Sequence, residues 1–248
     1  MGLQNFFREN PNMAIAFSGG ADSAYLLYMA ATYGQKVKAY YVKSQFQPQF
    51  ELEHARRLCK ELGVELCVIP LDQLSDPLIR QNEPLRCYYC KKRIFSAIHK
   101  AAVKDGYTIL CDGTNADDQE DDRPGFRALR ELEVRSPLRE CGITKSELRR
   151  LSKEAGLFTH DKAAYACLAT RVPTGEALTL EALQVTETAE GILYDIGFRD
   201  FRIRCSQGMP RLQIRREQFP LYTEKKERIL TALAPLYKEL WQEPEVRL

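Results

Sequence analysis

Glycine and hydroxyl side chains gather in one hexapeptide that lies between an apolar run and a helical pattern. Its residues are Ser18-Gly19-Gly20-Ala21-Asp22-Ser23. The apolar run at 13–17 predicts a buried parallel strand, and the pattern at 24–30 predicts a helix with an apolar face. At such a turn, backbone N–H groups beside glycine and the positive helix N-terminus attract an anion, and the two serines add hydroxyls. The hexapeptide therefore predicts phosphate binding, with Asp22 as a candidate Mg²⁺ ligand.

The spacing of the hexapeptide differs from that of two other phosphate-binding loops. It has neither the G-x-x-x-x-G-K-[ST] pattern of a P-loop nor the G-x-G-x-x-G pattern of dinucleotide-binding proteins. It resembles instead the pyrophosphatase loop, S-G-G-x-D-S. Enzymes with that loop use ATP to adenylate a substrate, and the loop holds the departing pyrophosphate. A glycine-rich turn that binds no nucleotide is the alternative interpretation.

Cys167 lies in a segment, 161–173, that has no long periodic pattern, and such loops often display reactive groups. A cysteine thiolate is a nucleophile, and neighbouring cations such as Lys162 or Arg171 would favour it. From the residues alone, a single cysteine among alanine and leucine is more often a small buried side chain.

Charged residues at two further places could bind ligands. Arg202 and Arg204 alternate on a predicted strand and so face the same side, as an anion site requires, although a solvated strand face fits equally. The acidic run 117–122 follows another predicted strand, where it could bind Mg²⁺ or ATP or be a solvated loop.

One pair of cysteines has the spacing of metal ligands. Cys87 and Cys90 form a single Cys-x-x-Cys, which is half of a tetrahedral zinc site. Single further ligands could come from Cys111, Cys141 or Cys205. The three histidines, at 54, 99 and 160, are too few to predict a multi-histidine centre, so we expect surface or packing roles for them.

The rest of the chain predicts alternating strands and helices. Further strands are predicted at 37–42, 64–69, 107–111 and 133–136, and helices at 51–62, 90–103 and 145–155. Thr144 and Glu147 have capping-box spacing for the last of these helices, and Gly156 ends it. The alternation predicts an α/β fold, a Rossmann-like parallel sheet covered on both faces, with ligands at the C-terminal strand ends.

The pattern changes after 173–175. Helices are predicted at 180–196 and 224–240, and strands at 201–205 and 211–215. We therefore expect two domains: an ATP-binding domain at 1–173, and a small C-terminal α/β domain at 176–248 for substrate binding or oligomerisation.

Length and charge exclude some classes of function. The 248 residues carry a formal charge of +2 with both signs spread throughout, so nothing demands a polyanionic partner. No stretch approaches a membrane span, and the N-terminus lacks a signal-peptide pattern. We expect a cytoplasmic protein with no nucleic-acid or membrane partner, whose eight cysteines are buried thiols, metal ligands or reactive groups rather than disulfides.

Together, the motifs are similar to those of the LarE-type sulfur transferases, ATP-dependent enzymes of the PP-loop (N-type ATP pyrophosphatase) superfamily. The similarity extends over about residues 1–215. It rests on the hexapeptide and on five other segments: Arg86-Cys87-Tyr88-Tyr89-Cys90-Lys91, Asp112-Gly113-Thr114-Asn115-Ala116-Asp117-Asp118, Asp122-Arg123-Pro124-Gly125, Ser136-Pro137-Leu138 and Ala166-Cys167-Leu168-Ala169-Thr170-Arg171.

The resemblance implies a reaction in two stages. ATP adenylates a carboxylate of a pyridinium biscarboxylate mononucleotide, and the Cys167 thiolate then attacks the acyl-adenylate to give a thioester. Cleavage of the Cβ–S bond leaves sulfur on the substrate and dehydroalanine at position 167, in synthesis of the nickel-pincer cofactor of lactate racemase. The resemblance also implies a homo-oligomer.

The resemblance implies roles for individual residues as well. ATP and pyrophosphate would contact Ser18, Gly19, Gly20, Asp22, Ser23, Asn115 and Arg123. Mg²⁺ would bind Asp22 and Asp118, and the substrate phosphate would bind Arg202, Arg204 and Glu190. Some relatives instead carry an Fe–S cluster on three cysteines that delivers an external sulfur, and this relay is the alternative to sacrifice of Cys167.

Three other functions stay open. A tRNA thiolase should show a basic stripe or an added RNA-binding domain, and an amide-forming ligase would not need Cys167. A nucleotide-binding regulator would bind ATP or AMP without releasing pyrophosphate. The acceptor also stays open, because Cys205-Ser206-Gln207-Gly208 stands where the family commonly has His-His-Gly, and Gln213 replaces an acidic residue.

Overall fold

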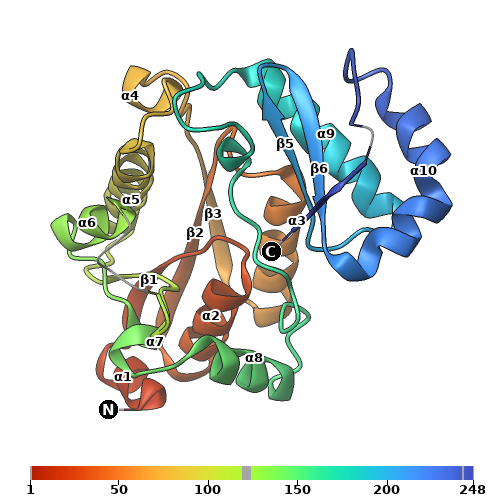
Figure 1. Cartoon of the computed structure of the whole chain (residues 1–248). Helices are drawn as coiled ribbons and strands as arrows, with labels where there is room; N and C mark the ends of the chain where they lie inside the picture. Colours follow the sequence, from red (N-terminus) through yellow and green to blue (C-terminus); the bar gives the residue numbers. More distant parts are fainter. Residues whose placement is uncertain (1, 119–123, 242, 248) are drawn as a thin grey trace. The chain divides into compact units, whose positions relative to one another are not determined.

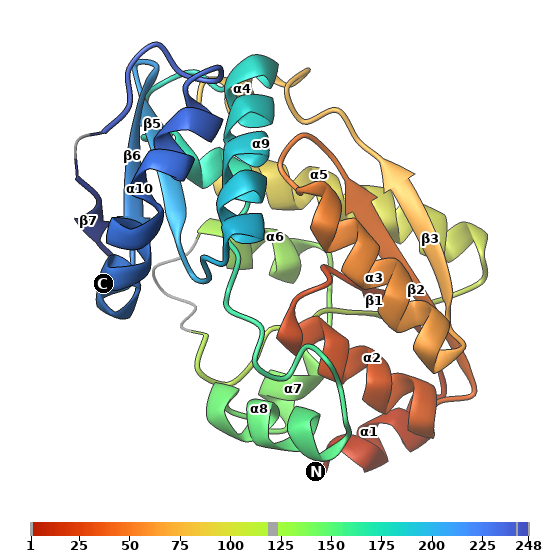
Figure 2. The ribbon, with the colours of Figure 1, turned by 90° about the vertical axis from the view of Figure 1, so that its right-hand side faces the viewer.

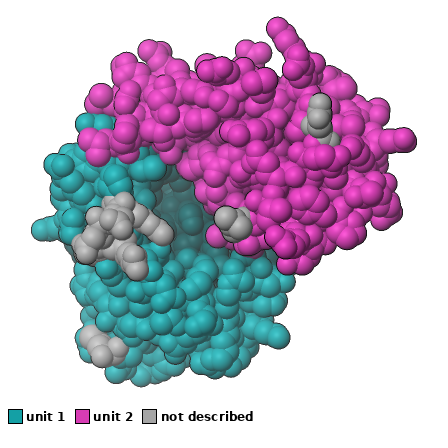
Figure 3. Space-filling model, viewed as in Figure 1, with its two compact units in different colours: residues 1–71, 87–162 teal, residues 72–86, 163–248 magenta. Residues whose placement is uncertain are grey.

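The computed structural model describes residues 2–118, 124–241 and 243–247. It divides the chain into two compact units, residues 1–71 with 87–162 and residues 72–86 with 163–248 (Figure 3). The second unit gains 72–86 through backbone hydrogen bonds, from Gly175 N to Asn82 O at 3.0 Å and from Leu178 N to Arg80 O at 2.7 Å. These units differ in their limits from the domains expected at 1–173 and 176–248, which stay a prediction.

A four-stranded parallel sheet forms the centre of the first unit, in the order β3-β2-β1-β4 (Figure 1). Its strands are β1 (Asn12–Ala16), β2 (Lys36–Lys43), β3 (Glu65–Pro70) and β4 (Leu110–Cys111). The parallel pairing confirms the predicted fold class. The strand expected at 133–136 is only an isolated bridge between Cys111 and Arg135, because Pro137, which has no N–H for a ladder, begins the next helix.

Helices cover both faces of this sheet (Figures 1 and 2). One face carries α1 (Leu3–Glu9), α2 (Ala21–Tyr33), α3 (Gln49–Leu62), α7 (Pro137–Glu140) and α8 (Lys145–Glu154); the other carries α5 (Arg86–Lys104) and α6 (Pro124–Glu131). Alternate side chains of one strand enter different cores: Ile15 packs in the first layer and Ala14 in the second. The sheet is thereby buried on both faces.

The second unit combines a small sheet with two long helices. β5 (Arg202–Ser206) and β6 (Met209–Ile214) pair antiparallel, β7 (Glu245–Val246) pairs parallel with β6, and the helices are α4 (Pro77–Arg80), α9 (Leu180–Ile196) and α10 (Phe219–Leu233). The helix predicted at 224–240 is wrong at its end, because α10 stops before Pro235, which cannot continue a helix. Within the described residues, none of the helices is both long and apolar enough to traverse a bilayer.

Candidate active site

The hexapeptide connects the end of β1 to the start of α2, as expected, and its serines close it on itself. The Ser18 and Ser23 hydroxyls lie 3.0 Å apart, Ser23 Oγ donates to Gly20 O at 3.2 Å, and Ser18 N donates to Ser23 Oγ at 3.3 Å. Gly20 is the N-cap of α2 and makes no side-chain cap bond to the helix. The first-turn N–H groups of α2 thus remain for an anion.

Glycine is required at two positions around the hexapeptide. Gly19 has φ of +78°, and a Cβ there would lie 2.8 Å from the backbone oxygen of Glu51. A Cβ on Gly113, in the loop after β4, would lie 2.7 Å from the backbone nitrogen of Ser23. Both glycines allow neighbouring backbones to approach the hexapeptide closely.

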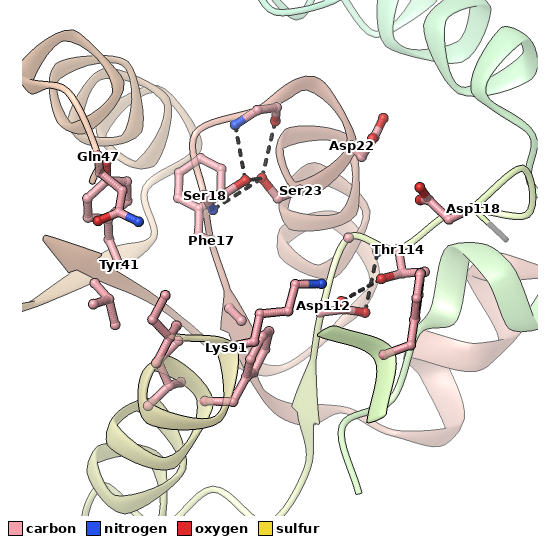
Figure 4. A pocket seen from close by; sticks show the side chains of 18 residues that line it. Phe17, Ser18, Asp22, Ser23, Tyr41, Gln47, Lys91, Asp112, Thr114 and Asp118 are labelled. Atoms are coloured by element: carbon pink, nitrogen blue, oxygen red, sulfur yellow. Dashed lines mark hydrogen bonds between the residues drawn. The ribbon is translucent and has the colours of Figure 1, made fainter. Parts of the chain in front are cut away.

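A cavity of about 350 Å³ opens beside the hexapeptide (Figure 4). Ser18, Gly20, Asp22 and Ser23 line one part of it. Its walls elsewhere are mostly apolar and come from the end of β1 and the residue after it, and from β2, α5 and α6: Ala16, Phe17, Tyr41, Val42, Ile94, Phe95, Ile98 and Phe126. A cavity with an apolar wall and a polar, anion-attracting end suits a purine nucleotide with its phosphates.

Lys91 is a site residue that sequence reasoning left without a role. Its side chain extends from α5 into the cavity, toward the hexapeptide and Asp112 (Figure 4). A signal was present, because Lys91, Ile94, Phe95 and Ile98 follow the i, i+3, i+4, i+7 spacing of one helix face. A lysine on an otherwise apolar, inward-facing stripe indicates a cation aimed at a ligand.

Asp112 organises the loop after β4. Its carboxylate accepts hydrogen bonds from Thr114 Oγ1 and Ser136 Oγ, both at 2.6 Å. Burial raises the pKa of Asp112, whereas these two donors and the charge of Lys91 act to lower it. Asp112 therefore holds the loop that carries Gly113 against the hexapeptide.

The two aspartates predicted to bind Mg²⁺ both line the cavity (Figure 4). Asn115 connects them, since its Nδ2 donates to Asp22 Oδ2 at 3.3 Å and its backbone N–H donates to Asp118 Oδ2 at 3.1 Å. Lys145 forms an ion pair with Asp22 Oδ1. Oxygen donors fit Mg²⁺ chemistry, so a metal ion there would compete with Lys145 for Asp22. Arg123 lies outside the described residues.

The sequence also left open a zinc or Fe–S site with several protein ligands. Among residues 2–118, 124–241 and 243–247, no three His, Cys, Asp or Glu side chains form a group that could hold a metal ion. Cys87 is exposed and Cys90 is half-buried, while Cys111 and Cys205 are buried. The zinc or Fe–S ligation that the sequence left open therefore has no assembled ligand set in the described part of the chain.

Cys167 is partly exposed and precedes a 3₁₀ turn, Leu168–Arg171, in the second unit. The backbone carbonyls around it are held by hydrogen bonds. Thr170 Oγ1 donates to Cys167 O at 2.8 Å, Arg86 Nη1 donates to Ala169 O at 2.8 Å, and Arg204 Nη1 donates to Thr170 O at 2.5 Å. Hydrogen bonds from three side chains to backbone carbonyls thus hold the turn after Cys167 in place.

Arg171 and Glu190 form a bidentate ion pair beneath this turn. Arg171 Nε and Nη2 donate to the two Glu190 oxygens at 2.7 and 2.9 Å, and the side chains are only 1% and 5% exposed. Glu190 also accepts from Tyr165 Oη at 2.6 Å and from Ile203 N at 2.9 Å. Its participation in phosphate binding stays a prediction.

The two arginines predicted to bind an anion lie on β5 and share one face, since Ile203 between them is buried. Burial, followed by the like charges of Arg247, Arg171 and Arg204, lowers the pKa of Arg202 to about 10. Such crowding of cations favours an anion at this face.

Residues 12–83, which include the hexapeptide, match the family described as queuosine biosynthesis protein QueC. The chain is 32% identical over 238 residues to the pyridinium-3,5-bisthiocarboxylic acid mononucleotide synthase of Lactiplantibacillus plantarum, covering 94% of this chain and 86% of that protein. It is 34% identical over 223 residues to an uncharacterized protein of Synechocystis, covering 90% and 83%. It is 27% identical over 187 residues to a tRNA-specific 2-thiouridylase of Pseudothermotoga lettingae, covering 61% and 54%.

Proposed function

The chain belongs to the LarE-type sulfur transferases of the PP-loop superfamily, and from that premise we propose that it adenylates a substrate carboxylate with ATP and then transfers sulfur to it from Cys167. Members of this family are ATP-using enzymes. The observation that carries the proposal is the hexapeptide at the polar end of an apolar-walled cavity. The proposed acceptor, a pyridinium-3,5-biscarboxylic acid mononucleotide, is the carboxylate precursor of the bisthiocarboxylic acid mononucleotide after which the L. plantarum relative is named.

In the first step, a substrate carboxylate oxygen attacks the α-phosphorus of ATP, and the bond to the β-phosphate oxygen breaks. The N–H groups at the start of α2 and the hydroxyls of Ser18 and Ser23 bind the departing pyrophosphate. Lys91 in the cavity neutralises phosphate charge. Mg²⁺, which Asp22 and Asp118 would hold, supplies further neutralisation of the pyrophosphate.

In the second step, the Cys167 thiolate attacks the acyl carbon, and AMP leaves with the electron pair of the C–O bond. Removal of the Cα proton of Cys167 then breaks its Cβ–S bond, so that the thiocarboxylate departs and dehydroalanine remains. Arg202 and Arg204 bind the phosphate of the acceptor nucleotide. The hydrogen-bonded turn Leu168–Arg171 supports this proposal because it fixes the backbone next to the reacting sulfur.

The proposed partner is thus a small nucleotide-like carboxylate, and we propose that the protein acts in the cytoplasm as a homo-oligomer. The small formal charge of +2 supports a small-molecule acceptor over a nucleic acid.

The test is the intact mass of the protein before and after incubation with ATP, Mg²⁺ and the pyridinium biscarboxylate mononucleotide. We expect a loss of H₂S, about 34 Da, that maps to Cys167, together with release of pyrophosphate and AMP. Cys167→Ala should release pyrophosphate without changing mass, and the matched control Cys87→Ala, at an exposed cysteine, should lose the same mass as the wild type.

Two results would overturn parts of the proposal. Unchanged mass with pyrophosphate released would overturn sacrifice of Cys167 and leave adenylation with a relayed sulfur. Absence of pyrophosphate and AMP would overturn adenylation of this acceptor.

A further inference from the structure

The ammonium group of Lys162 is held by three acceptors in the first unit. Its Nζ donates to Gly19 O at 2.8 Å and to Glu51 Oε2 at 2.6 Å, and it lies 3.0 Å from His54 Nδ1. An ammonium group has three N–H donors, so each of them has a partner. The sequence suggested Lys162 as a cation that favours the Cys167 thiolate, whereas the structure directs its charge to the hexapeptide.

The surroundings of Lys162 make this arrangement rigid. The Lys162 and Glu51 side chains are only 14% and 8% exposed. His54 packs edge-on against Phe50 and Phe158, with ring centroids 5.7 Å apart in both pairs. Burial, the charge of Lys162 and the charge of Arg57 lower the pKa of His54, which favours the neutral ring. Because an ammonium group has donors only, its contact with Nδ1 requires the tautomer in which Nδ1 accepts.

The backbone of Lys162 is held independently of its side chain. Its N–H donates to Thr159 O at 3.2 Å, and its carbonyl accepts from Arg149 Nη2 at 3.2 Å. Arg149 belongs to α8, so the position of Lys162 is set by the helix that packs beside α2. The Lys162 ammonium therefore contacts the hexapeptide from a residue whose backbone is held in place.

The contact with Gly19 has a consequence for the anion site. The carbonyl of Gly19 and the N–H of Gly20 belong to one planar trans peptide and point in opposite directions. Lys162 holds that carbonyl from one side, and on the other side the Gly20 N–H, at the N-cap of α2, donates a long hydrogen bond of 3.4 Å to Ser18 Oγ, so the Lys162 bond helps to set the direction of this N–H. Because glycine at φ of +78° is conformationally permissive, nothing within the residue itself would fix this peptide plane.

We propose that Lys162 is a positioning residue of the pyrophosphate site, which acts through the Gly19 carbonyl to orient the N–H groups that bind the β- and γ-phosphates of ATP. Lys162 does not itself contact the phosphates. The inference rests on the proposed function only in that the hexapeptide binds ATP and pyrophosphate. It does not depend on the fate of Cys167.

The test compares three ligands, namely pyrophosphate, ATP and AMP, by titration calorimetry in the presence of Mg²⁺. In Lys162→Met, pyrophosphate and ATP should bind about 10- to 100-fold more weakly, the range expected for loss of a hydrogen bond to a charged group, while AMP should bind within about twofold of the wild type. Lys153→Met, at an exposed lysine on α8, is the matched control and should bind all three ligands like the wild type.

A second variant guards against simple unfolding. Lys162→Met alone leaves the Glu51 carboxyl buried without its cation, so Glu51→Leu with Lys162→Met removes the ion pair as a whole. This double variant should fold and show the same selective loss of pyrophosphate affinity. Equal weakening of AMP and pyrophosphate, or unchanged pyrophosphate binding in both variants, would overturn the role of Lys162. A wild-type protein that binds neither ATP nor pyrophosphate would instead overturn the proposed site itself.

Discussion

Each unit contains a buried carboxylate that holds a cation against a backbone carbonyl of a candidate functional segment. In the first unit, Glu51 pairs with Lys162, which donates to Gly19 O. In the second, Glu190 pairs with Arg171, whose Nη1 donates to Ala166 O at 3.0 Å. Both arrangements hold a backbone carbonyl of a loop in place.

The two pairs differ in how much structure they join. Lysine is a point charge, and Lys162 divides its three donors among three acceptors. Arginine has a planar guanidinium group, and Arg171 donates two hydrogen bonds to the Glu190 carboxylate. Glu190 also accepts from Tyr165 Oη and Ile203 N. Glu190 thus joins a helix, a strand and the cysteine segment. The Glu190 carboxylate therefore has a structural role that extends beyond its loop.

Breaking the Arg171–Glu190 ion pair of the second unit should change stability more than any other substitution considered. Glu190→Gln should lower the free energy of unfolding of that unit by about 3–5 kcal/mol, because it leaves the buried Arg171 without a counter-charge. Trp241, the one tryptophan of the chain, packs in the core of the second unit, so urea unfolding followed by its fluorescence reports on this unit.

The control is Asp195→Asn, at an exposed carboxylate on the same helix, which should change the unfolding free energy by less than about 0.5 kcal/mol. A loss below about 1 kcal/mol in Glu190→Gln would contradict the structural role assigned to Glu190.

A pair of glycine substitutions sharpens the contrast between the units. Gly113→Ala places a Cβ 2.7 Å from Ser23 N, and backbone atoms cannot yield as a flexible side chain can. We expect a cost of about 1–3 kcal/mol, seen in calorimetry as roughly tenfold weaker ATP binding. Gly191→Ala on α9 meets no atom within 4 Å and should instead stabilise the second unit by about 0.5–1 kcal/mol in the fluorescence assay. Wild-type ATP affinity in Gly113→Ala would show that the loop after β4 does not shape the nucleotide site.

The fold was predictable where one local pattern determines one element. The apolar run 13–17 and the glycine-rich turn after it identify β1, the hexapeptide and α2, and the Thr144 cap marks the start of α8. Prediction failed where a later residue overrides the pattern, as Pro235 does for α10. The packing of 72–86 with the second unit depends on backbone hydrogen bonds and on bonds from the Asn82 and Arg86 side chains to backbone carbonyls far along the chain, and no local sequence pattern predicts such partners.

The same distinction applies to the candidate site. The hexapeptide and Cys167 could be singled out because their residue types are themselves chemical signals, although their catalytic roles stay predictions. Lys91 was within reach, since its helical spacing places it on an inward face. The bond from Lys162 to Gly19 was not, because it joins residues far apart in the chain and depends on how α3 and α8 pack.

A smaller effect is expected for the pH dependence of stability, through His54, which contacts the Lys162 ammonium beside the hexapeptide. Burial lowers the pKa of His54 in the folded protein, as do the charges of Lys162 and Arg57, while Glu53 opposes them. The unfolded chain then binds more protons than the folded one between the folded pKa and the ordinary value of 6.5, so stability falls as pH drops through that window. One histidine limits the slope to about 1.4 kcal/mol per pH unit, which is one proton.

The measurement is the difference in unfolding free energy between pH 7.5 and pH 5.5, compared between wild type and His54→Gln, whose side chain stays neutral at both values. The wild type should lose more stability on acidification than His54→Gln, because the unfolded wild-type chain binds a proton at residue 54 that the folded protein, with His54 beside the Lys162 ammonium, resists. His99→Gln, at an exposed histidine on α5, should follow the wild type. If His54→Gln and the wild type lose the same stability, the neutral form of His54 is not favoured in the folded protein. His54 Nδ1 would then not be the third acceptor of the Lys162 ammonium. Such a result would count against the described contacts of Lys162 in the first unit. It would not bear on the second unit, since Arg171 pairs directly with Glu190 and no histidine takes part.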